Sequence, residues 1–269
     1  MPDCVALRLA DLVVRVCMHP NGLPADKLAS YKPWLVPPNG AEASIEIVWS
    51  DVGVGQDGRY AVKDAREAGL SEGAAILERT MDWGEARYAV KFFSFSPEID
   101  GERLLAQGIA MTLLAHGRLM IHAAAIERQG AGYLFFGPSG AGKTTVARVS
   151  RDCRVLNDDL VIIGQDGTQQ WWVFSTPFTH PKQVAPSGLA RAPLRGVFRL
   201  VQSKEVRVAP LHSVAALSHL LPQVPILPRD TVCIERVWDQ LCALVNSYQV
   251  YDLYFLPDAS FWRVIDDLQ

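Results

Sequence analysis

Residues 137–144 contain a glycine-rich phosphate-loop pattern, which constrains the fold more than any other feature of the chain. The segment reads Gly-Pro-Ser-Gly-Ala-Gly-Lys-Thr and has the spacing G-x-x-x-x-G-K-[ST]. Glycines at these places allow backbone N–H groups to surround a phosphate. The lysine of such a loop reaches the β- and γ-phosphates, and the hydroxyl group that follows binds Mg²⁺. The pattern therefore predicts a nucleotide site that uses Lys143 and Thr144.

The residues around this loop favour the same interpretation. Residues 133–136 are an apolar run typical of a buried strand, and residues 143–149 are typical of a helix. A helix that begins directly after such a loop points backbone N–H groups at the phosphate. The alternative is a glycine-rich turn without a ligand. We expect Mg²⁺ and a nucleoside triphosphate, contacted by Gly137, Ser139, Gly140, Ala141, Gly142, Lys143, Thr144 and Thr145.

Two adjacent acids, Asp158 and Asp159, interrupt an apolar stretch at residues 154–163. Burying two carboxylates costs free energy unless a cation lies beside them, and Mg²⁺ at a triphosphate is such a cation. In phosphoryl transfer one carboxylate holds the metal, and another accepts the proton of the attacking hydroxyl. The pair therefore predicts a metal ligand and a catalytic base. The alternative is a solvated turn, because Asn-Asp pairs favour turns.

His122 is a third candidate. Residues 120–126 are typical of a strand and residues 128–132 of a turn, so a hairpin is expected to place His122 beside the strand that enters the loop. A lone histidine on an apolar strand is more often part of the core than catalytic. The pattern alone leaves both roles open.

The order of these motifs resembles that of the HPr kinase/phosphorylase-related P-loop proteins, whose nucleotide core is similar to that of ATP-type phosphoenolpyruvate carboxykinases. The resemblance rests on Ile121-His122, on residues 137–145 and on Asp158-Asp159. It covers about residues 118–178 and continues more weakly, in a manner similar to HPr-kinase-like proteins of peptide-modification gene clusters, including lasso-peptide kinases. It implies that His122, Lys143, Asp158 and Asp159 are catalytic, with Thr144 and Asp158 at the metal.

The resemblance implies an ATP- and Mg²⁺-dependent kinase that phosphorylates a serine or threonine hydroxyl of a protein or peptide. The residues after 178 do not reproduce the pattern of the dephosphorylating enzymes, which argues against phosphorylase activity and against HPr as the acceptor. Carboxykinases are about twice as long, which argues against that activity. Two alternatives stay open: an ATP-binding module that controls assembly without catalysis, and a kinase of a small metabolite such as free serine.

Composition and charge exclude several classes of protein. The chain has 269 residues, a net charge of −3 and no basic stripe, so nucleic acid is not an expected partner. No run is long and apolar enough to predict a membrane helix, and the N-terminus does not look like a signal peptide. The five cysteines are scattered and odd in number, which predicts reduced thiols and a cytoplasmic location. The resemblance also implies a possible homo-oligomer.

We expect an α/β fold with α+β character in two parts. A β-rich N-terminal module of unknown role is predicted at residues 1–99, with strands at 5–10, 12–18, 43–49, 75–79 and 86–95. A nucleotide-binding kinase domain with a mixed sheet, similar to HPr kinase, is predicted at 100–269. Its first helix is expected to begin with Asp100 as the N-cap.

The remaining elements follow from turn signals and periodicity. Beyond the acid pair we expect a hairpin turn at 165–167 and a strand at 170–174. A polar loop at 179–193 resembles a lid or binding loop, from which Lys182 or Arg191 could reach phosphate; the alternative is a solvated surface loop. A hairpin of strands 194–201 and 206–208, helices at 213–221, 230–247 and 261–268, and a strand at 250–256 complete the prediction.

Overall fold

The computed structural model is mixed α/β and forms two compact units. It describes residues 4–20, 22–49, 70–71, 74–94, 96–150, 152–178, 184, 188–225 and 231–268. The first unit contains Met1–His116 with Ile226–Ile234, and the second contains Gly117–Pro225 with Glu235–Gln269. Among the helices of the described residues, none combines the length and the apolar character needed to span a membrane.

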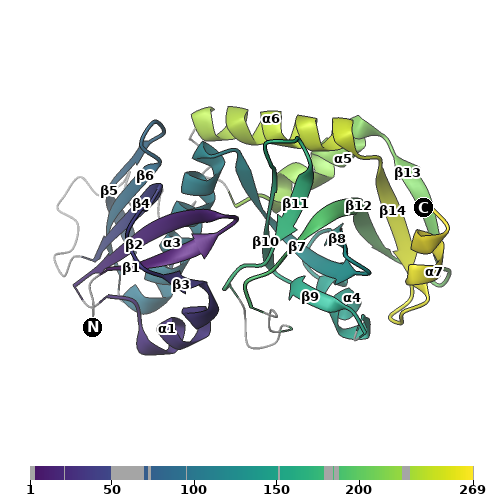
Figure 1. Ribbon diagram of the computed structural model, residues 1–269, viewed down its shortest axis with the longest axis horizontal. Helices are drawn as coiled ribbons and strands as arrows, with labels where there is room; N and C mark the ends of the chain where they lie inside the picture. Colours follow the sequence, from purple (N-terminus) through teal and green to yellow (C-terminus); the bar gives the residue numbers. More distant parts are fainter. Residues whose placement is uncertain are drawn as a thin grey trace. The chain divides into compact units, whose positions relative to one another are not determined.

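The first unit is built on a mixed sheet of six strands, in the order β3-β1-β2-β4-β6-β5 (Figure 1). Strands β2, β4 and β6 run parallel to one another, whereas β1, β3 and β5 are antiparallel to their neighbours. These three parallel strands therefore end at a common edge of the sheet. The elements are β1 (Cys4–Leu9), β2 (Leu12–His19), α1 (Ala25–Tyr31), η1 (Lys32–Trp34), β3 (Leu35–Val36), β4 (Ala43–Trp49), β5 (Ala75–Asp82), β6 (Arg87–Phe93) and α3 (Pro97–Ala115).

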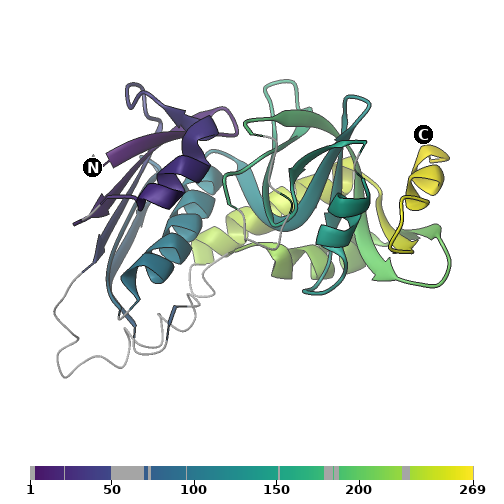
Figure 2. The same ribbon diagram turned by 90° about the horizontal axis from the view of Figure 1, so that it is seen from below.

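Helix α3 covers one face of this sheet (Figure 2). Alternate apolar residues of the parallel strands, such as Ile45 and Tyr88, face the helix and are buried. Gly108 allows this close approach, because a Cβ there would lie 2.7 Å from the Tyr88 ring and 3.1 Å from Ile45. The helix therefore packs on the first sheet through a position that has no side chain.

The start of α3 and the division of the chain differ from the prediction. The helix begins at Pro97, whose missing N–H costs nothing in a first turn. Asp100 is not the N-cap, because it is a fully buried residue inside the helix. The predicted boundary at 99/100 assigns the helix to the second part, whereas the structure divides after His116 because the helix packs on β4 and β6.

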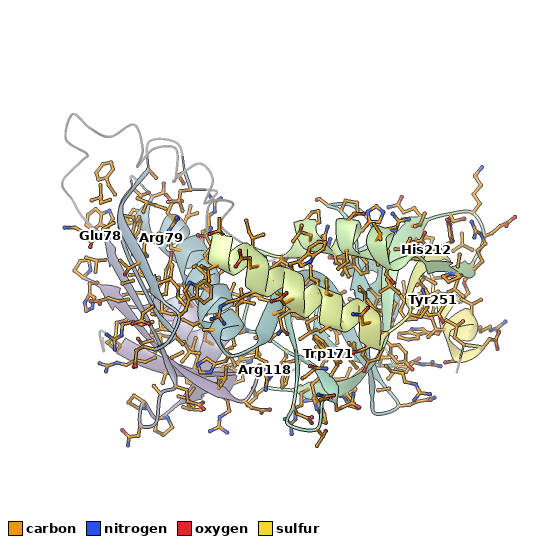
Figure 3. All side chains as sticks on the ribbon, turned by 90° about the horizontal axis from the view of Figure 1, so that it is seen from above. Glu78, Arg79, Arg118, Trp171, His212 and Tyr251 are labelled. Atoms are coloured by element: carbon orange, nitrogen blue, oxygen red, sulfur yellow. A yellow bond between two sulfur atoms is a disulfide. The ribbon has the colours of Figure 1, made fainter. Side chains whose placement is uncertain are left out.

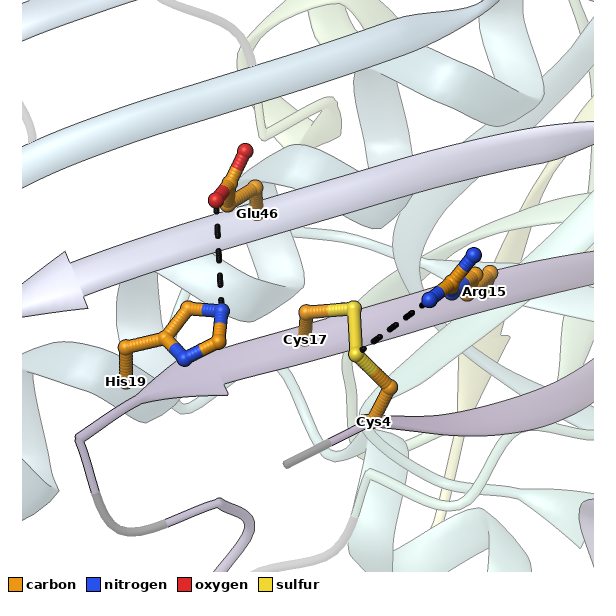
Figure 4. The surroundings of a disulfide bond; sticks show 5 residues. All are labelled: Cys4, Arg15, Cys17, His19 and Glu46. Carbon is orange, nitrogen blue, oxygen red and sulfur yellow. Dashed lines mark hydrogen bonds and ion pairs between the residues drawn. A yellow bond between two sulfur atoms is a disulfide. The ribbon is translucent and has the colours of Figure 1, made fainter. Parts of the chain in front are cut away.

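The expectation that all cysteines are reduced is wrong for two of them. Cys4 and Cys17 form a disulfide across the β1–β2 hairpin, and the Arg15 guanidinium lies 3.7 Å from the Cys4 sulfur (Figure 4). The turn at Ala10 and Asp11 sets a register in which the two cysteines face each other directly. Disulfides are rare in cytosolic proteins, so the argument from the thiols to a cytoplasmic location no longer holds.

The second unit contains a mixed sheet of eight strands, in the order β11-β10-β7-β8-β12-β14-β13, with β9 also paired to β7. Because β11 pairs with β12 as well, five of the strands close into a ring: β11, β10, β7, β8 and β12. The strands are β7 (Arg118–Arg128), β8 (Ala131–Phe136), β9 (Arg154–Asn157), β10 (Leu160–Gln165), β11 (Trp171–Phe174), β12 (Arg191–Gln202), β13 (Arg207–Leu211) and β14 (Val250–Phe255).

Aromatic side chains form much of the core of this unit. The Phe135 ring packs against those of Phe198 and Trp262 at centroid distances of 5.6 and 5.7 Å, and Tyr251, which is labelled in Figure 3, stacks on Phe198. The Trp171 indole N–H donates a hydrogen bond at 3.2 Å to Oγ of Ser247, the last residue of the helix Thr231–Ser247. The helical elements are α4 (Lys143–Val149), α5 (Ser213–Leu220), η2 (Leu221–Gln223), α6 (Thr231–Ser247) and α7 (Phe261–Asp266).

Most predicted elements of this part are present, but two strand assignments are wrong. Residues 154–163 are not one strand, because β9 and β10 are separate and both pair with β7, on either side of the acid pair. Strands β12 and β13 do not pair with each other, so the predicted hairpin of strands 194–201 and 206–208 is wrong. Strand β14 lies between them, parallel to β12 and antiparallel to β13. Strand β12 instead pairs with residues 53 positions later in the chain.

Candidate active site

One edge of the second sheet collects the predicted site residues. Strands β8, β12 and β14 run parallel and end at Phe136, Gln202 and Phe255. Strand β9 runs in the same direction as β8, because both are antiparallel to β7. The glycine-rich loop follows β8, and Asp158 follows β9. The carboxyl ends of such strands are the usual location of a ligand site in an α/β sheet.

Glycine is required by the shape of this loop. Gly142 has φ +115° and contacts the last strand so closely that a Cβ would lie 2.5 Å from the Phe255 ring. Gly140 has φ +80°, a left-handed conformation that other residues rarely adopt. The backbone is therefore wound into a form that side chains at these positions would prevent.

Lys143 begins helix α4 and is held inside the loop. Its Nζ donates hydrogen bonds to the carbonyl oxygens of Gly137 at 2.9 Å and Pro138 at 3.3 Å. Burial lowers the pKa of Lys143, and the nearby Asp159 carboxylate opposes that shift. The ammonium group therefore lies among loop carbonyls, from which a rotation of its flexible chain can bring it to a bound phosphate.

Asp158 is a buried carboxylate without normal hydrogen bonds. It is only 1% exposed, and within the described part of the chain neither of its oxygens has a hydrogen-bond partner. Burial raises the pKa of Asp158, although the Thr144 hydroxyl and the Val184 backbone N–H lie near enough to favour the charged form. A buried, unpartnered carboxylate is unfavourable by itself, and a metal cation beside Thr144 would remove that cost.

Asp159 differs from its neighbour because it is accessible and has a partner. Its Oδ1 lies 3.2 Å from His122 Nε2, and both side chains are about one-third exposed, at 27% and 39%. The backbone supports this arrangement, since the Ala123 N–H donates to the Asp159 carbonyl at 2.9 Å and Leu160 pairs with His122. The pairing of β10 with β7 thus places His122 next to the acid pair, one residue before β7 begins to pair with β8.

These groups surround an open polar pocket of about 300 Å³. Its lining comprises His122, Ser139, Gly140, Gly142, Lys143, Thr144, Thr145 and Asp158. Gly137 and Ala141 are not among the lining residues; they shape the loop, since the Ala141 Cβ packs against the Gly137 backbone. Residues predicted from three separate segments of the sequence therefore meet at one place.

Arg191, one of the two candidates from the predicted polar loop, is not among the residues that line this pocket. It is the first residue of β12, and its guanidinium lies 4.5 Å from the centre of the Trp172 ring. Its partner in β11 is Phe174, which pairs in turn with Ile162 of β10. A contact between Arg191 and phosphate stays a prediction. Lys182, the other candidate, lies outside the described residues.

Asn157 supports the site and was missed at the sequence level. It is fully buried, and its Oδ1 accepts the Asp159 N–H at 2.7 Å. Its Nδ2 donates to the carbonyl oxygens of Thr176 at 3.1 Å and Phe178 at 2.8 Å. Asn157 therefore fixes the backbone of the acid pair to the segment after β11. The sequence feature that could have indicated this supporting role is an asparagine directly before two acids at the end of a strand.

Gln202 is a second supporting residue. Its Nε2 donates to the Gly140 carbonyl oxygen at 2.7 Å, so the end of β12 holds the tip of the glycine-rich loop. No sequence pattern could have shown this, because the contact joins residues 62 positions apart.

The residues of the pocket fit a nucleoside triphosphate with Mg²⁺. The glycine backbone leaves the space that a Cβ would fill, Lys143 provides a cation, and Asp158 provides two unpartnered oxygens. Within the described ranges no three acidic, histidine or cysteine residues form a cluster suited to a metal. Mg²⁺ needs none, because it is usually bound by one or two carboxylates together with water and substrate phosphates.

The fold and the site define a mixed α/β protein with a glycine-rich strand–loop–helix segment facing an acid pair. Residues 104–225 match a family model described as SynChlorMet cassette protein ScmC. The match includes the loop, His122 and both acids, but it covers less than half of the chain, so the chain is similar to that family over this segment. No curated protein matches the chain.

Proposed function

We propose that this protein is an ATP- and Mg²⁺-dependent kinase of the HPr-kinase-like type, which phosphorylates a serine or threonine hydroxyl of a peptide or protein. The observation that carries the proposal is the pocket in which a glycine-rich loop, Lys143 and the unpartnered Asp158 meet. The matched family is described as a cassette protein, which agrees with action on a partner encoded with it.

We assign different roles to the two acids because their surroundings differ. Asp158 is buried beside the Thr144 hydroxyl, so these two residues would hold the metal. Asp159 is partly exposed and contacts His122, so it would accept the proton of the acceptor hydroxyl while the imidazole fixes the carboxylate. This assignment separates functions that the sequence left shared between the acids.

Lys143 and the loop N–H groups would hold the phosphates in place for transfer. ATP would supply the phosphoryl group, and Mg²⁺ would neutralise charge on its oxygens. The protein has little covalent chemistry to perform in such a reaction, so positioning and electrostatics provide most of the rate. The Lys143 ammonium acts in a pocket that already excludes much of the solvent around it, which strengthens its effect.

The Asp159–His122 pair favours catalysis over a module that only binds nucleotide. A binding module requires phosphate contacts and a metal ligand, but it requires no second, partly exposed acid in contact with a histidine that lines the pocket. The pair therefore makes assembly control without turnover the weaker alternative, and the experiment below distinguishes the two.

The direct test is incubation with γ-labelled ATP, Mg²⁺ and a set of peptides containing serine or threonine, followed by mass spectrometry. Transfer of phosphate to a peptide hydroxyl would support the proposal. Phosphorylation of free serine alone would show a metabolite kinase, and tight binding of ATP without turnover in any mixture would show a binding module.

Lys143→Ala provides the matched test of the nucleotide site. Removing a charged hydrogen-bond donor from bound phosphate should weaken Mg·ATP binding by about tenfold or more and abolish transfer. Calorimetric titration with a non-hydrolysable ATP analogue measures the binding. Lys91→Ala removes an exposed lysine of β6 in the first unit and serves as the control. Equal affinity of the Lys143 variant and the parent would show that the loop does not bind phosphate.

A further inference from the structure

A pocket with a largely apolar lining lies in the first unit, and it shares no lining residue with the phosphate-loop pocket. Its volume is about 530 Å³, which is within the range of ligand sites in proteins. It lies where the parallel strands β2, β4 and β6 end, on the face that α3 covers. Residues that line it include Met18, Leu23, Ile47, Trp49, Phe92 and Pro97.

The interior of this pocket is apolar and its shape is fixed by the fold. Ile47, Phe92 and Leu23 are buried at its base, with exposures of 1%, 1% and 4%. The Trp49 indole N–H is already used, because it donates to the Ser94 carbonyl oxygen at 3.2 Å. That hydrogen bond orients the indole as a wall of the pocket. An occupant is therefore recognised here by apolar contact and not by hydrogen bonds to these side chains.

The mouth of the pocket carries a negative charge. Asp26 in the first turn of α1 is the one carboxylate among the lining residues, and it is exposed. The neighbouring cation, Lys27, is paired with Glu102 at 2.6 Å, so it is not available to neutralise Asp26. A positive group on an occupant would therefore be attracted to this rim.

We propose that this pocket binds a short apolar segment of a peptide or protein partner in which a lysine or arginine adjoins the apolar side chains. The cavity is larger than one side chain needs, and its lining matches apolar residues, while Asp26 matches the adjoining cation. If the phosphorylation proposed above is correct, the occupant is the phosphate acceptor. The binding itself does not depend on that function, and it is tested without nucleotide.

Methyl NMR provides a direct test, because Met18 lies in the wall of the pocket. The protein is labelled with ¹³C at the methionine methyl groups and titrated with the peptide Gly-Lys-Phe-Leu-Lys-Gly. Peptides with glutamate in place of lysine, or glycine in place of Phe-Leu, are the controls. We expect the Met18 signal to shift with the first peptide, while that of Met120 in the second unit stays unchanged. Met18→Leu assigns the signal.

Two variants with matched controls test the location and the charge. Ala25→Trp fills the mouth and should weaken binding at least tenfold, since apolar burial is lost, whereas Ala29→Trp on the same helix should not. Asp26→Lys lies at an exposed position and should preserve the fold. It should reduce affinity for the lysine peptide up to about fivefold and increase it for the glutamate peptide.

Several outcomes would overturn the proposal. The pocket is not a peptide site if Met18 does not respond to the Phe-Leu peptides, or responds equally to the glycine peptide. Equal effects of Ala25→Trp and Ala29→Trp would place the binding elsewhere. A Met18 shift produced by indole or benzyl alcohol but by no peptide would identify a small-molecule site instead. A failure of kinase activity would leave these binding results unaffected, so the two proposals fail separately.

Discussion

Asp100 in the first unit and Asp158 in the second are both buried carboxylates, with exposures of 0% and 1%, but their surroundings differ. Asp100 accepts hydrogen bonds from the Ser71 N–H and hydroxyl and from the Ser94 hydroxyl, at 2.5 to 3.0 Å. Asp158 has no hydrogen bond of normal geometry in the described part of the chain. Hydrogen bonds from the protein satisfy the first carboxylate, whereas the second has the Thr144 hydroxyl and the Val184 N–H nearby without hydrogen bonds of normal geometry.

The difference is the one expected between a structural acid and an acid that binds a ligand. A satisfied buried carboxylate stabilises the segment that it holds, here the start of α3 and the end of β6. An unsatisfied one costs free energy in the free protein, and proteins retain such costs mainly where function needs them. Exposure and residue type are the same in both places, so the hydrogen-bond partners alone distinguish the two roles.

The largest expected effect is on turnover. Asp158→Asn removes the charge that would hold the metal but keeps the shape, so it should lower the rate of phosphate transfer by about 10²–10³-fold. Asp100→Asn should leave the rate within about twofold of the parent. Initial rates with labelled ATP at saturating Mg²⁺ measure both. Similar losses of rate in the two variants would remove the proposed distinction.

The second effect is on stability and has the opposite pattern. Asp100→Asn replaces one carboxylate oxygen by an NH₂ group, which cannot accept the hydrogen bonds that Ser71 or Ser94 now donates, so it should lower the free energy of unfolding by about 1–3 kcal/mol. Urea denaturation followed by circular dichroism measures the change. An unchanged midpoint would mean that the Ser71 and Ser94 hydrogen bonds contribute nothing to the stability of the first unit.

A smaller effect is expected at the partner of the second acid. His122→Ala removes the group 3.2 Å from Asp159, which should lower turnover about tenfold, since partners that orient a functional carboxylate typically contribute 10- to 100-fold. His122→Gln retains a polar N–H and should recover part of the loss. Full activity of the His122→Ala variant would show that this histidine is a structural residue only.

The smallest effect is the pH dependence that follows from the raised pKa of Asp158. The unfolded chain has an ordinary pKa of about 3.9, and the folded value is higher. At a pH between these two pKa values, Asp158 is protonated in the folded protein and ionised in the unfolded chain. The parent protein without Mg²⁺ or nucleotide should therefore lose stability as the pH rises through this interval.

In the Asp158→Asn variant this side chain cannot titrate, so the loss of stability with rising pH should be absent. Its free energy of unfolding at neutral pH should exceed that of the parent in the absence of ligands, and Mg·ATP should stabilise only the parent strongly. Denaturation at a series of pH values between about 4 and 7 measures the difference. A parallel pH dependence in both proteins would show that Asp158 is not the carboxylate responsible.

Local signals explain which parts of the structure could be predicted. The glycine-rich loop, the hairpin at Gln129 and Gly130 and the strands beside them depend on residues close in sequence, and they are present. The hairpin also brings the strand of His122 beside the strand that enters the loop, as expected. In this region turn chemistry and apolar periodicity agree, so few alternative arrangements remain.

Distant contacts explain what could not be predicted. The position of β14 between β12 and β13 depends on a strand far along the chain, so a nearby hairpin was the natural but wrong expectation. The hydrogen bonds of Asn157 become visible only when the segment after β11 is in place. The Cys4–Cys17 disulfide depended on the register of one turn, which was not worked out from the sequence.

The contact between Gly142 and Phe255 has a consequence for the order in which the protein is made. The loop is wound against a ring that the ribosome adds more than 100 residues later. Since domains begin to fold during synthesis, an emerging chain can form the β7–β8 hairpin long before β14 exists. A nascent chain that ends before residue 250 lacks the surface on which the loop is shaped. Capture of such stalled chains on immobilised ATP should therefore fail until β14 has left the ribosome.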